Sequence, residues 1–283
     1  MTKLIIAVPA YNEEMALSSV LKKIAQCQPK DTENRILVIN DGSTDNTKEI
    51  AISNGADFIV SHKHNLGVAQ AYRTAIVAAL ELGADIICTI DADGQFCPSE
   101  IPKLVAPIKS GMTDVVIGSR FMNPALCKNI PIMNKIANQM MAKLISLLIR
   151  KQVYDTECGF RAISSTAAAN LDLLGLVSFS NDMILDTSMK NFRILEVPVS
   201  VKYYEERDSR VIKGFIKYGI KSFCLIILKI LSASLSRNLF SKIHPQIEVI
   251  RVHKGEVTPL NESGVINRGK FIQLRKAEGV ETT

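Results

Sequence analysis

Short apolar runs recur along the first 120 positions and are separated by stretches of helical periodicity. The runs occupy residues 4–8, 36–39, 57–60, 86–90 and 115–117. Between them, segments such as 16–25 and 69–80 carry an apolar residue at every third or fourth position. Strands that alternate with amphipathic helices build a mostly parallel sheet with helices on both faces. The pattern therefore predicts an α/β fold.

Polar clusters follow three of the predicted strands. They are 9–14 (PAYNEE), 41–45 (DGSTD) and 91–94 (DADG). In open sheets of this kind, ligands bind at the carboxyl ends of the strands. Because parallel strands end at the same edge, we expect the three loops to form one site.

The second half of the chain has a different organisation. A helical pattern covers 130–149, a polar loop follows over 154–161, and 195–201 is a predicted strand. Segment 211–235 is amphipathic, with lysines at an i, i+4, i+8 spacing beside aliphatic residues. We predict a first domain over 1–210, amphipathic interface helices over 211–239, and an extension over 240–283 of unknown role, either a small hairpin or loose chain.

Composition excludes several classes of protein. With 283 residues, 47% hydrophobic and 22% charged, the chain is globular rather than fibrous or disordered. Its six cysteines are scattered without a C-x-x-C pair, which favours a reduced, cytoplasmic location. No uncharged apolar stretch reaches the roughly 20 residues that span a bilayer.

The net charge of +6 is concentrated late in the chain, because 207–243 holds eight basic residues and one acid. Aliphatic rather than aromatic residues separate these charges, which argues against nucleic acid. A basic, aliphatic segment favours an anionic membrane surface or a phosphate partner, although a solvated helix face has the same composition.

Asp91 and Asp93 are the strongest candidates for chemistry. They follow a buried strand, and two nearby carboxylates suit Mg²⁺ or Mn²⁺ completed by substrate phosphates. The alternative is ordinary turn chemistry, which Asp also serves. The loop that begins at Asp41 is equally compatible with a helix N-cap. His62 and His64 resemble a metal pair, but no His or Cys cluster completes it, and we expect no histidine site.

Five motifs together resemble family 2 glycosyltransferases with the GT-A (nucleotide-diphospho-sugar transferase) fold. They are 8–14 (VPAYNEE), 41–45 (DGSTD), 65–67 (NLG), 91–95 (DADGQ) and 117–120 (IGSR). Later motifs resemble the branch of dolichol-phosphate mannose synthases and related polyprenyl-phosphate sugar transferases. These are 155–161 (DTECGFR), Asp182, 196–199 (EVPV) and Ser209-Arg210.

The resemblance implies a fold with C-terminal amphipathic helices and an inverting transfer of sugar from a GDP- or UDP-sugar to a polyprenyl or dolichyl phosphate. By position, the implied nucleotide-binding residues are Pro9, Tyr11, Glu13 and Asp41. Asp91 and Asp93 would hold the metal, with Gln95 beside the donor diphosphate. The candidates for binding the donor and acceptor phosphates are Arg120, Lys135, Arg207 and Arg210.

The acceptor remains open at this stage. Tyr204 stands where the branch commonly has an Arg, and Ser209-Arg210 replaces the usual Ser-Lys. A phosphate acceptor needs no strong base because its second pKa is about 6. A hydroxyl acceptor on a glycan would need one, and Asp182 is the first candidate, with a helix N-cap as its structural alternative.

Three functions follow in order of preference. The first is a metal-dependent enzyme, peripheral on the cytoplasmic face of a membrane that it meets through 211–235. The second is a soluble family 2 transferase with a hydroxyl acceptor, and the third is a non-catalytic nucleotide-sugar-binding scaffold. The sequence leaves the oligomeric state open.

Overall fold

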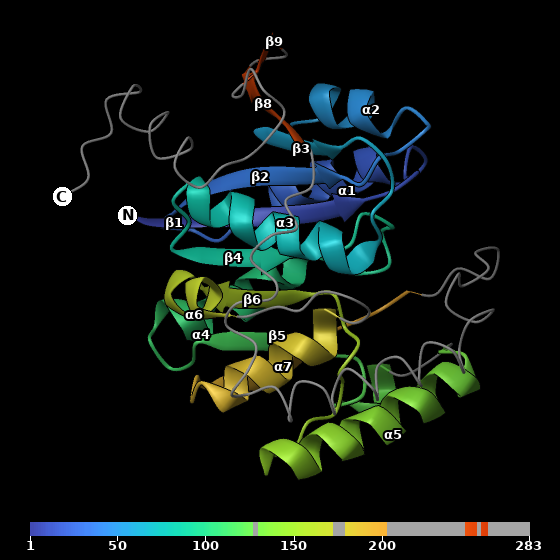
Figure 1. The fold of residues 1–283 in the computed structure, drawn as a ribbon, viewed down its shortest axis with the longest axis vertical. Helices are drawn as coiled ribbons and strands as arrows, with labels where there is room; N and C mark the ends of the chain where they lie inside the picture. The colour runs from blue at the N-terminus through green and yellow to red at the C-terminus, as the bar shows by residue number, and fades with distance from the viewer. Residues whose placement is uncertain (127–129, 172–178, 203–246, 254–255, 260–283) are drawn as a thin grey trace.

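The computed structural model describes residues 1–126, 130–171, 179–202, 247–253 and 256–259. Within these residues a sheet of nine strands runs through the molecule in the order β7-β5-β6-β4-β1-β2-β3-β8-β9 (Figure 1). The strands are β1 (Thr2–Ala10), β2 (Thr32–Asn40), β3 (Phe58–His62), β4 (Ile86–Thr89), β5 (Val115–Ser119), β6 (Arg161–Ser164), β7 (Ile194–Pro198), β8 (Ile247–His253) and β9 (Glu256–Pro259).

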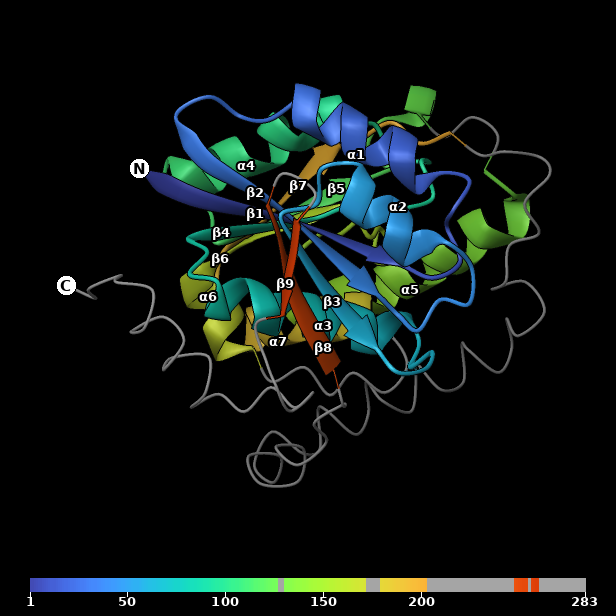
Figure 2. The same cartoon turned by 90° about the horizontal axis from the view of Figure 1, so that it is seen from above.

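Helices cover both faces of this sheet. They are α1 (Leu17–Gln26), α2 (Thr47–Ser53), α3 (Val68–Glu81), α4 (Ile101–Lys109), α5 (Ile132–Ile149), α6 (Ser165–Asn170) and α7 (Phe179–Met189), with short 3-10 turns at Pro98–Glu100 and Pro124–Leu126. Figure 2 shows α1, α2 and α4 on one side of the sheet and α3, α6 and α7 on the other. The predicted α/β class, with a mostly parallel sheet between helices, is confirmed.

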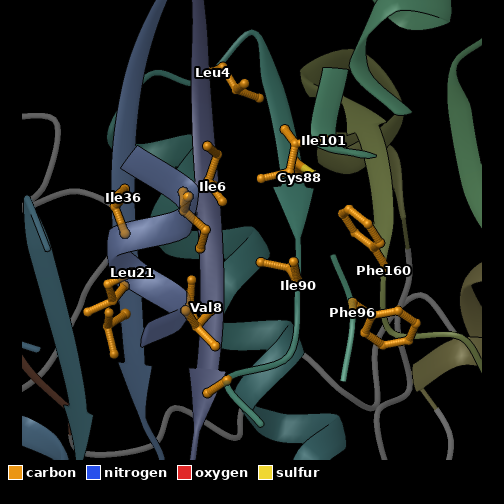
Figure 3. Packing of buried hydrophobic residues seen from close by; sticks show 14 of the residues in the cluster. Leu4, Ile6, Val8, Leu21, Ile36, Cys88, Ile90, Phe96, Ile101 and Phe160 are labelled. Carbon is orange, nitrogen blue, oxygen red and sulfur yellow. The ribbon is translucent and has the colours of Figure 1, made fainter. Parts of the chain in front are cut away.

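The alternation of side chains along β1 divides the core into two layers. Ile5 and Ala7 pack on the side of α3, whereas Leu4, Ile6 and Val8 pack on the side of α1 and α4 (Figure 3). All five are fully buried. A strand buried on both faces reads as a continuous apolar run, which is why the sequence located β1 so clearly.

Parallel pairing brings the ends of the central strands to one edge. β1 pairs in parallel with β2 and β4, and β2 pairs in parallel with β3. The loops that follow β1, β2 and β4 therefore leave the sheet side by side. This agrees with the expectation that the three polar clusters lie at one edge of the sheet.

One strand was missed. The polar loop predicted over 154–161 ends in β6, which pairs antiparallel with both β4 and β5. Its first residue, Arg161, is almost fully buried, so hydrophobicity alone gave no strand signal there. The side chain donates hydrogen bonds to the backbone carbonyls of Cys158, Thr156 and Ser180, which compensates for its removal from water.

The C-terminal part of the chain returns to the sheet. β8 pairs antiparallel with β3, and β9 pairs antiparallel with β8, so part of the predicted extension joins the sheet of the first domain. The amphipathic helices predicted over 211–239 lie outside the described residues. None of the helices in the described part of the chain combines the length and apolar character that crossing a bilayer requires.

Candidate active site

The loops after β1 and β2 are tied together by hydrogen bonds from backbone N–H groups of one to side chains of the other. The N–H of Asn12 donates to Ser43 Oγ at 3.0 Å, and the N–H of Glu13 donates to Thr47 Oγ1 at 2.9 Å. Asn12 has a left-handed φ of 53°, which turns the chain sharply at the end of β1. Two predicted nucleotide-binding residues, Tyr11 and Glu13, therefore lie on a loop of fixed shape, and a third, Pro9, lies near the end of β1 just before it.

Asp41 is buried and fully engaged by its own chain. Its Oδ1 contacts His62 Nδ1 at 2.6 Å and accepts the N–H of Leu66 at 2.9 Å. Its Oδ2 accepts the N–H of Gly67 at 2.9 Å and the amide of Asn65 at 3.1 Å. A carboxylate has about four acceptor positions, so this one holds the 65–67 loop against β2.

Contacts within the rest of the 41–45 loop explain why its sequence contains Gly42 and Asp45. A Cβ on Gly42, whose φ is +67°, would lie 2.2 Å from the backbone carbon of His64, so only glycine fits. Asp45 accepts the N–H of Thr47 at 3.0 Å, which supports the turn alternative, but the N-cap of α2 is Asn46 and makes no side-chain capping bond, so the prediction of an N-cap within 41–45 is wrong. His62, one of the two histidines considered as a metal pair, binds Asp41 and Thr74 instead.

Asp91 and Asp93 leave the sheet at the end of β4. The Tyr72 hydroxyl, brought in by α3, donates to Asp91 Oδ1 at 2.5 Å. Asp93 Oδ1 accepts the N–H of Gln95 at 2.9 Å. Gly159 closes the site from the other side, because a Cβ there would lie 2.3 Å from the Tyr72 hydroxyl and 2.6 Å from Asp91 Oδ2.

The electrostatic environment of Asp91 shows which charges share the site. Its pKa is raised to about 6, because burial and the charge of Asp93 raise it by more than the Tyr72 hydrogen bond and the charge of Arg120 lower it. The charge of Glu13 also raises it. The structure therefore brings Glu13, Asp91, Asp93 and Arg120 within electrostatic range of one another.

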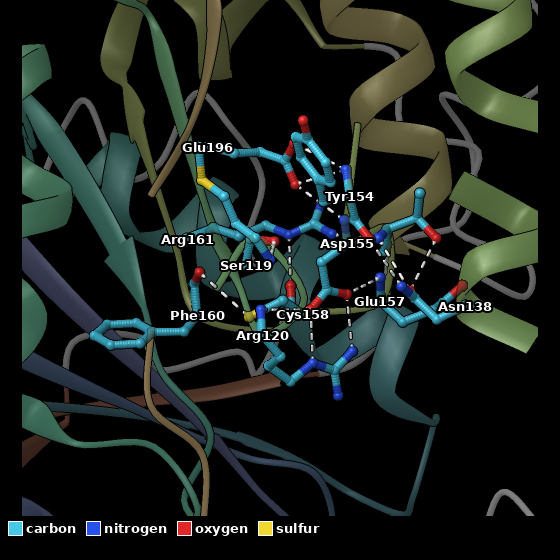
Figure 4. Close-up of polar contacts among 12 residues, drawn as sticks. Ser119, Arg120, Asn138, Tyr154, Asp155, Glu157, Cys158, Phe160, Arg161 and Glu196 are labelled. Atoms are coloured by element: carbon cyan, nitrogen blue, oxygen red, sulfur yellow. Dashed lines mark hydrogen bonds and ion pairs between the residues drawn. The ribbon is translucent and has the colours of Figure 1, made fainter. Parts of the chain in front are cut away.

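Arg120 is fixed by a buried carboxylate. Its Nε and Nη2 donate to the two oxygens of Asp155 at 2.7 and 2.9 Å, and its backbone N–H donates to the same carboxylate at 3.0 Å (Figure 4). Although burial acts to raise the pKa of Asp155, the charge and hydrogen bonds of Arg120 hold it below its ordinary value. The two-pronged geometry sets the guanidinium plane at the end of β5.

The loop that carries Asp155 is held from three directions (Figure 4). Glu196 on β7 accepts the N–H of Asp155 at 2.9 Å, and Asn138 on α5 accepts the N–H of Thr156 at 3.1 Å. Arg161 binds carbonyls of the same loop from the start of β6. This explains why the DTECGFR motif mixes charged residues with glycine in a largely buried segment.

The remaining predicted site residues lie on different elements, and two of them lie outside the described part of the chain. Asp182 lies in the first turn of α7, which begins at Phe179, so the alternative that it is an N-cap is wrong. Gln95 shares the Asp93 turn, and Lys135 lies in the first turn of α5. Arg207 and Arg210 lie outside the described residues.

Sequence reasoning gave no role to Tyr72, Asp155 or Gly159. Asp155 and Gly159 belong to the 155–161 motif, which the sequence analysis recognised without giving its residues a role. Tyr72 sits on the apolar face of α3 and looks like an ordinary core residue, and only the tertiary structure aims its hydroxyl at Asp91.

The acidic pair fits a divalent cation. The charge of Asp93 raises the pKa of Asp91, a repulsion that a positive ion between the two carboxylates would relieve, and both offer the hard oxygen atoms that Mg²⁺ and Mn²⁺ prefer. No group of three or more metal-ligating side chains occurs in the described ranges. Mg²⁺ and Mn²⁺ are commonly held by one or two carboxylates together with substrate phosphates, so a pair of carboxylates is sufficient.

The sheet order, with the acidic pair leaving a central strand, defines the GT-A class of fold, and solved structures share it. Glucosyl-3-phosphoglycerate synthase from Mycobacterium tuberculosis, solved with Mn²⁺, uridine-diphosphate and phosphoglyceric acid, superposes with a TM-score of 0.61. The alignment covers 81% of this chain and 78% of that one at 20% identity, which supports the fold alone.

The chain belongs to the family described as Glycosyl transferase family 2, whose profile matches residues 5–170. It is 33% identical over 230 residues to UDP-N-acetylglucosamine--dolichyl-phosphate N-acetylglucosaminyltransferase from Methanococcus voltae, covering 74% of this chain and 90% of that one. It is 32% identical over 204 residues to dolichyl-phosphate hexose transferase from Haloferax volcanii, covering 72% and 83%. The protein is thus a family 2 glycosyltransferase, with relatives named for lipid-phosphate acceptors.

Proposed function

We propose that the protein transfers a sugar from a GDP- or UDP-sugar to a polyprenyl or dolichyl phosphate at a membrane surface, with inversion at the anomeric carbon. The observation that supports this most directly is the acidic pair Asp91 and Asp93 beside an arginine already paired with a buried carboxylate. Its relatives named for dolichyl phosphate supply the acceptor class.

The charge balance argues for a cation. Glu13, Asp91 and Asp93 place negative charge at the site, and the charge of Arg120 is already matched by Asp155. Two anionic substrates, a diphosphate donor and a phosphate acceptor, would be repelled by these carboxylates. A divalent ion held by Asp91 and Asp93 would offset the charge of these two carboxylates and would help to neutralise the charge that develops on the departing diphosphate.

The chain itself positions the reacting groups. Asp155 fixes the orientation of the Arg120 guanidinium, so its N–H groups act on phosphate oxygens as donors held in place, and such donors need no reorganisation in the transition state. An acceptor phosphate oxygen attacks the anomeric carbon, that bond forms as the bond to the donor diphosphate breaks, and the nucleoside diphosphate leaves. Since the acceptor phosphate is largely dianionic at neutral pH, no proton has to be removed from it.

Turnover of a panel of GDP- and UDP-sugars with Mn²⁺ or Mg²⁺ tests this function. Radiolabel is followed into the organic phase with and without a short polyprenyl phosphate. We expect lipid labelling that Asp93→Asn abolishes and that Glu49→Gln, an exposed acid on α2, leaves unchanged.

Other outcomes separate the alternatives. Metal-dependent donor hydrolysis without lipid labelling would refute the lipid-phosphate acceptor. Transfer to a glycan hydroxyl that is lost in Asp182→Asn would establish the second candidate. Absence of any donor turnover with either metal would favour the scaffold.

A further inference from the structure

Tyr72 is a core residue whose one polar side-chain atom meets the acidic pair. It lies on α3 and is almost fully buried, and its ring stacks on that of Phe179 at the start of α7, with centroids 4.8 Å apart and planes at 18°. Figure 2 shows α3 and α7 on the same side of the sheet. A phenylalanine would fill this place in the core equally well, so the hydroxyl is what tyrosine adds.

The hydroxyl has one proton and two oxygen atoms within hydrogen-bond distance. Asp91 Oδ1 lies at 2.5 Å and the carbonyl oxygen of Gly159 at 3.1 Å. The carboxylate is the stronger acceptor, and a short O–H···O⁻ distance is typical of such bonds. The Gly159 carbonyl accepts a hydrogen bond from the hydroxyl of Thr89 at 2.8 Å as well. The Tyr72 proton therefore belongs to Asp91.

Both partners of this hydrogen bond are held in place. The stack on Phe179 fixes the ring of Tyr72. Gly159 lies directly against the carboxylate of Asp91, because a Cβ on that glycine would be 2.6 Å from Oδ2 and 2.8 Å from Oδ1. The two oxygens of Asp91 are consequently not equivalent, since Oδ1 is held by the phenol and Oδ2 is not.

This difference matters for the kind of cation that Asp91 can hold. An ion that takes both oxygens of the carboxylate shares Oδ1 with the positively polarised hydrogen of Tyr72, whereas an ion that takes Oδ2 alone avoids it. Ca²⁺ accepts roughly six to eight oxygen ligands and often takes both oxygens of one carboxylate. Mg²⁺ is smaller and demands a near-octahedral shell, to which a carboxylate usually contributes one oxygen.

We propose that Tyr72 is a positioning residue that fixes Oδ1 of Asp91, makes Asp91 a one-oxygen ligand, and so selects a small octahedral cation over Ca²⁺. The inference rests on the proposed function, because it takes Asp91 to be a ligand of the cation at the donor diphosphate. Cation binding can nevertheless be measured without any transfer of sugar.

Mn²⁺ binding to the full chain, followed by electron paramagnetic resonance, tests the proposal, and Ca²⁺ affinity follows from competition with Mn²⁺. Both are measured without nucleotide and again with UDP or GDP. The test variant is Tyr72→Phe, which keeps the ring and removes the hydroxyl. The matched control is Thr113→Val, which removes a buried hydroxyl that donates to the carbonyl of Arg193 at 2.8 Å, at the opposite end of β5 from the site.

We expect Tyr72→Phe to weaken Mn²⁺ binding at least about tenfold, because partners that orient a metal ligand contribute about that much to affinity. Ca²⁺ binding should change little, since Oδ1 becomes available to the larger ion. The ratio of Mn²⁺ to Ca²⁺ affinity therefore falls by nearly the same factor. Thr113→Val should leave both affinities as in the wild type, and circular dichroism verifies that each variant is folded.

A second pair of variants tests the support of the ring. Phe179→Leu keeps the Tyr72 hydroxyl and removes the stack, and we expect it to lower the Mn²⁺ affinity in the same direction by a smaller factor. Its control is Phe192→Leu, at an aromatic residue that packs against the same layer of the core, and this variant should bind Mn²⁺ as the wild type does.

Three results would overturn the proposal. The first is an Mn²⁺ affinity in Tyr72→Phe that is unchanged or higher. The second is an equal loss of Mn²⁺ and Ca²⁺ affinity, which would leave Tyr72 a merely structural role. The third is absence of Mn²⁺ binding by the wild type under all three conditions. Each is separate from the proposed function, because sugar transfer to the lipid phosphate is decided by the turnover assay.

Discussion

Replacing Asp91 with asparagine should stabilise the metal-free protein while abolishing its activity. In the wild type, burial and the neighbouring charge of Asp93 oppose ionisation of Asp91 and raise its pKa from 3.8 to about 6. Asparagine has nearly the same shape and carries no charge at any pH. Its carbonyl oxygen can still accept the hydrogen bond from Tyr72, so the substitution removes the repulsion without removing the contact.

The magnitude follows from the pKa. A carboxyl whose pKa is raised in the folded state contributes stability that is fully present below pH 3.8 and is lost as the pH rises through about 6. At about 1.4 kcal/mol for each pKa unit, the loss at pH 7.5 is at most about 3 kcal/mol. Because Asp91 is only partly covered from solvent, we expect a value below that limit. For a chain of this length, the corresponding rise in melting temperature is about 5–10 °C.

Thermal unfolding of Asp91→Asn and the wild type in EDTA, from pH 4 to 8, measures this difference. We expect equal melting temperatures near pH 4 and a widening advantage for the variant above pH 6. Mn²⁺ should then raise the melting temperature of the wild type and leave that of the variant unchanged. A difference that does not vary with pH would refute the reasoning, because it would mean that Asp91 does not titrate differently in the folded state.

Three other predictions concern the contacts that build the site. Gly159→Ala places a methyl group against Tyr72 and Asp91, and since a displacement of about 1 Å can cost about 100-fold in rate, kcat in the turnover assay should fall by that order. Asp155→Asn leaves Arg120 without its buried partner, so urea denaturation should show a loss of about 3–5 kcal/mol. Asp41→Asn turns an amide toward backbone N–H groups, and differential scanning fluorimetry without nucleotide should show a loss of about 1–3 kcal/mol.

Each of these has a control. Asp114→Asn breaks the pair with Arg193, whose side chain is largely exposed, and should cost less than about 1 kcal/mol, so an equal loss in Asp155→Asn would contradict the burial argument. An unchanged kcat in Gly159→Ala would show that Asp91 can move without consequence. If Asp41→Asn raised the KM for donor and left the melting temperature unchanged, Asp41 would be a nucleotide ligand rather than a loop anchor.

Much of the fold could be predicted because the central strands are buried on both faces. The run at 4–8 and the run at 86–90 correspond to β1 and β4, and the helical pattern at 69–80 corresponds to α3. β6 was not predicted because it begins with a buried arginine. The carbonyl groups that make burial of Arg161 favourable belong to Ser180, which is distant in sequence, and to Cys158, which lies in an irregular loop. The return of β8 to the edge of β3 depends on a long-range pairing for which the sequence has no local signal.

The sequence by itself determined the chemistry of the site: two carboxylates after a buried strand, an arginine after another, and polar loops that parallel pairing must gather at one edge. Only the tertiary structure decided how these groups are held. Tyr72 on Asp91, Asp155 on Arg120, and His62 on Asp41 join residues from different elements, at separations of 19, 35 and 21 positions. The physical reason is that periodicity and local propensity record burial and backbone conformation, whereas the aim of a buried hydroxyl or carboxylate depends on which element packs against it.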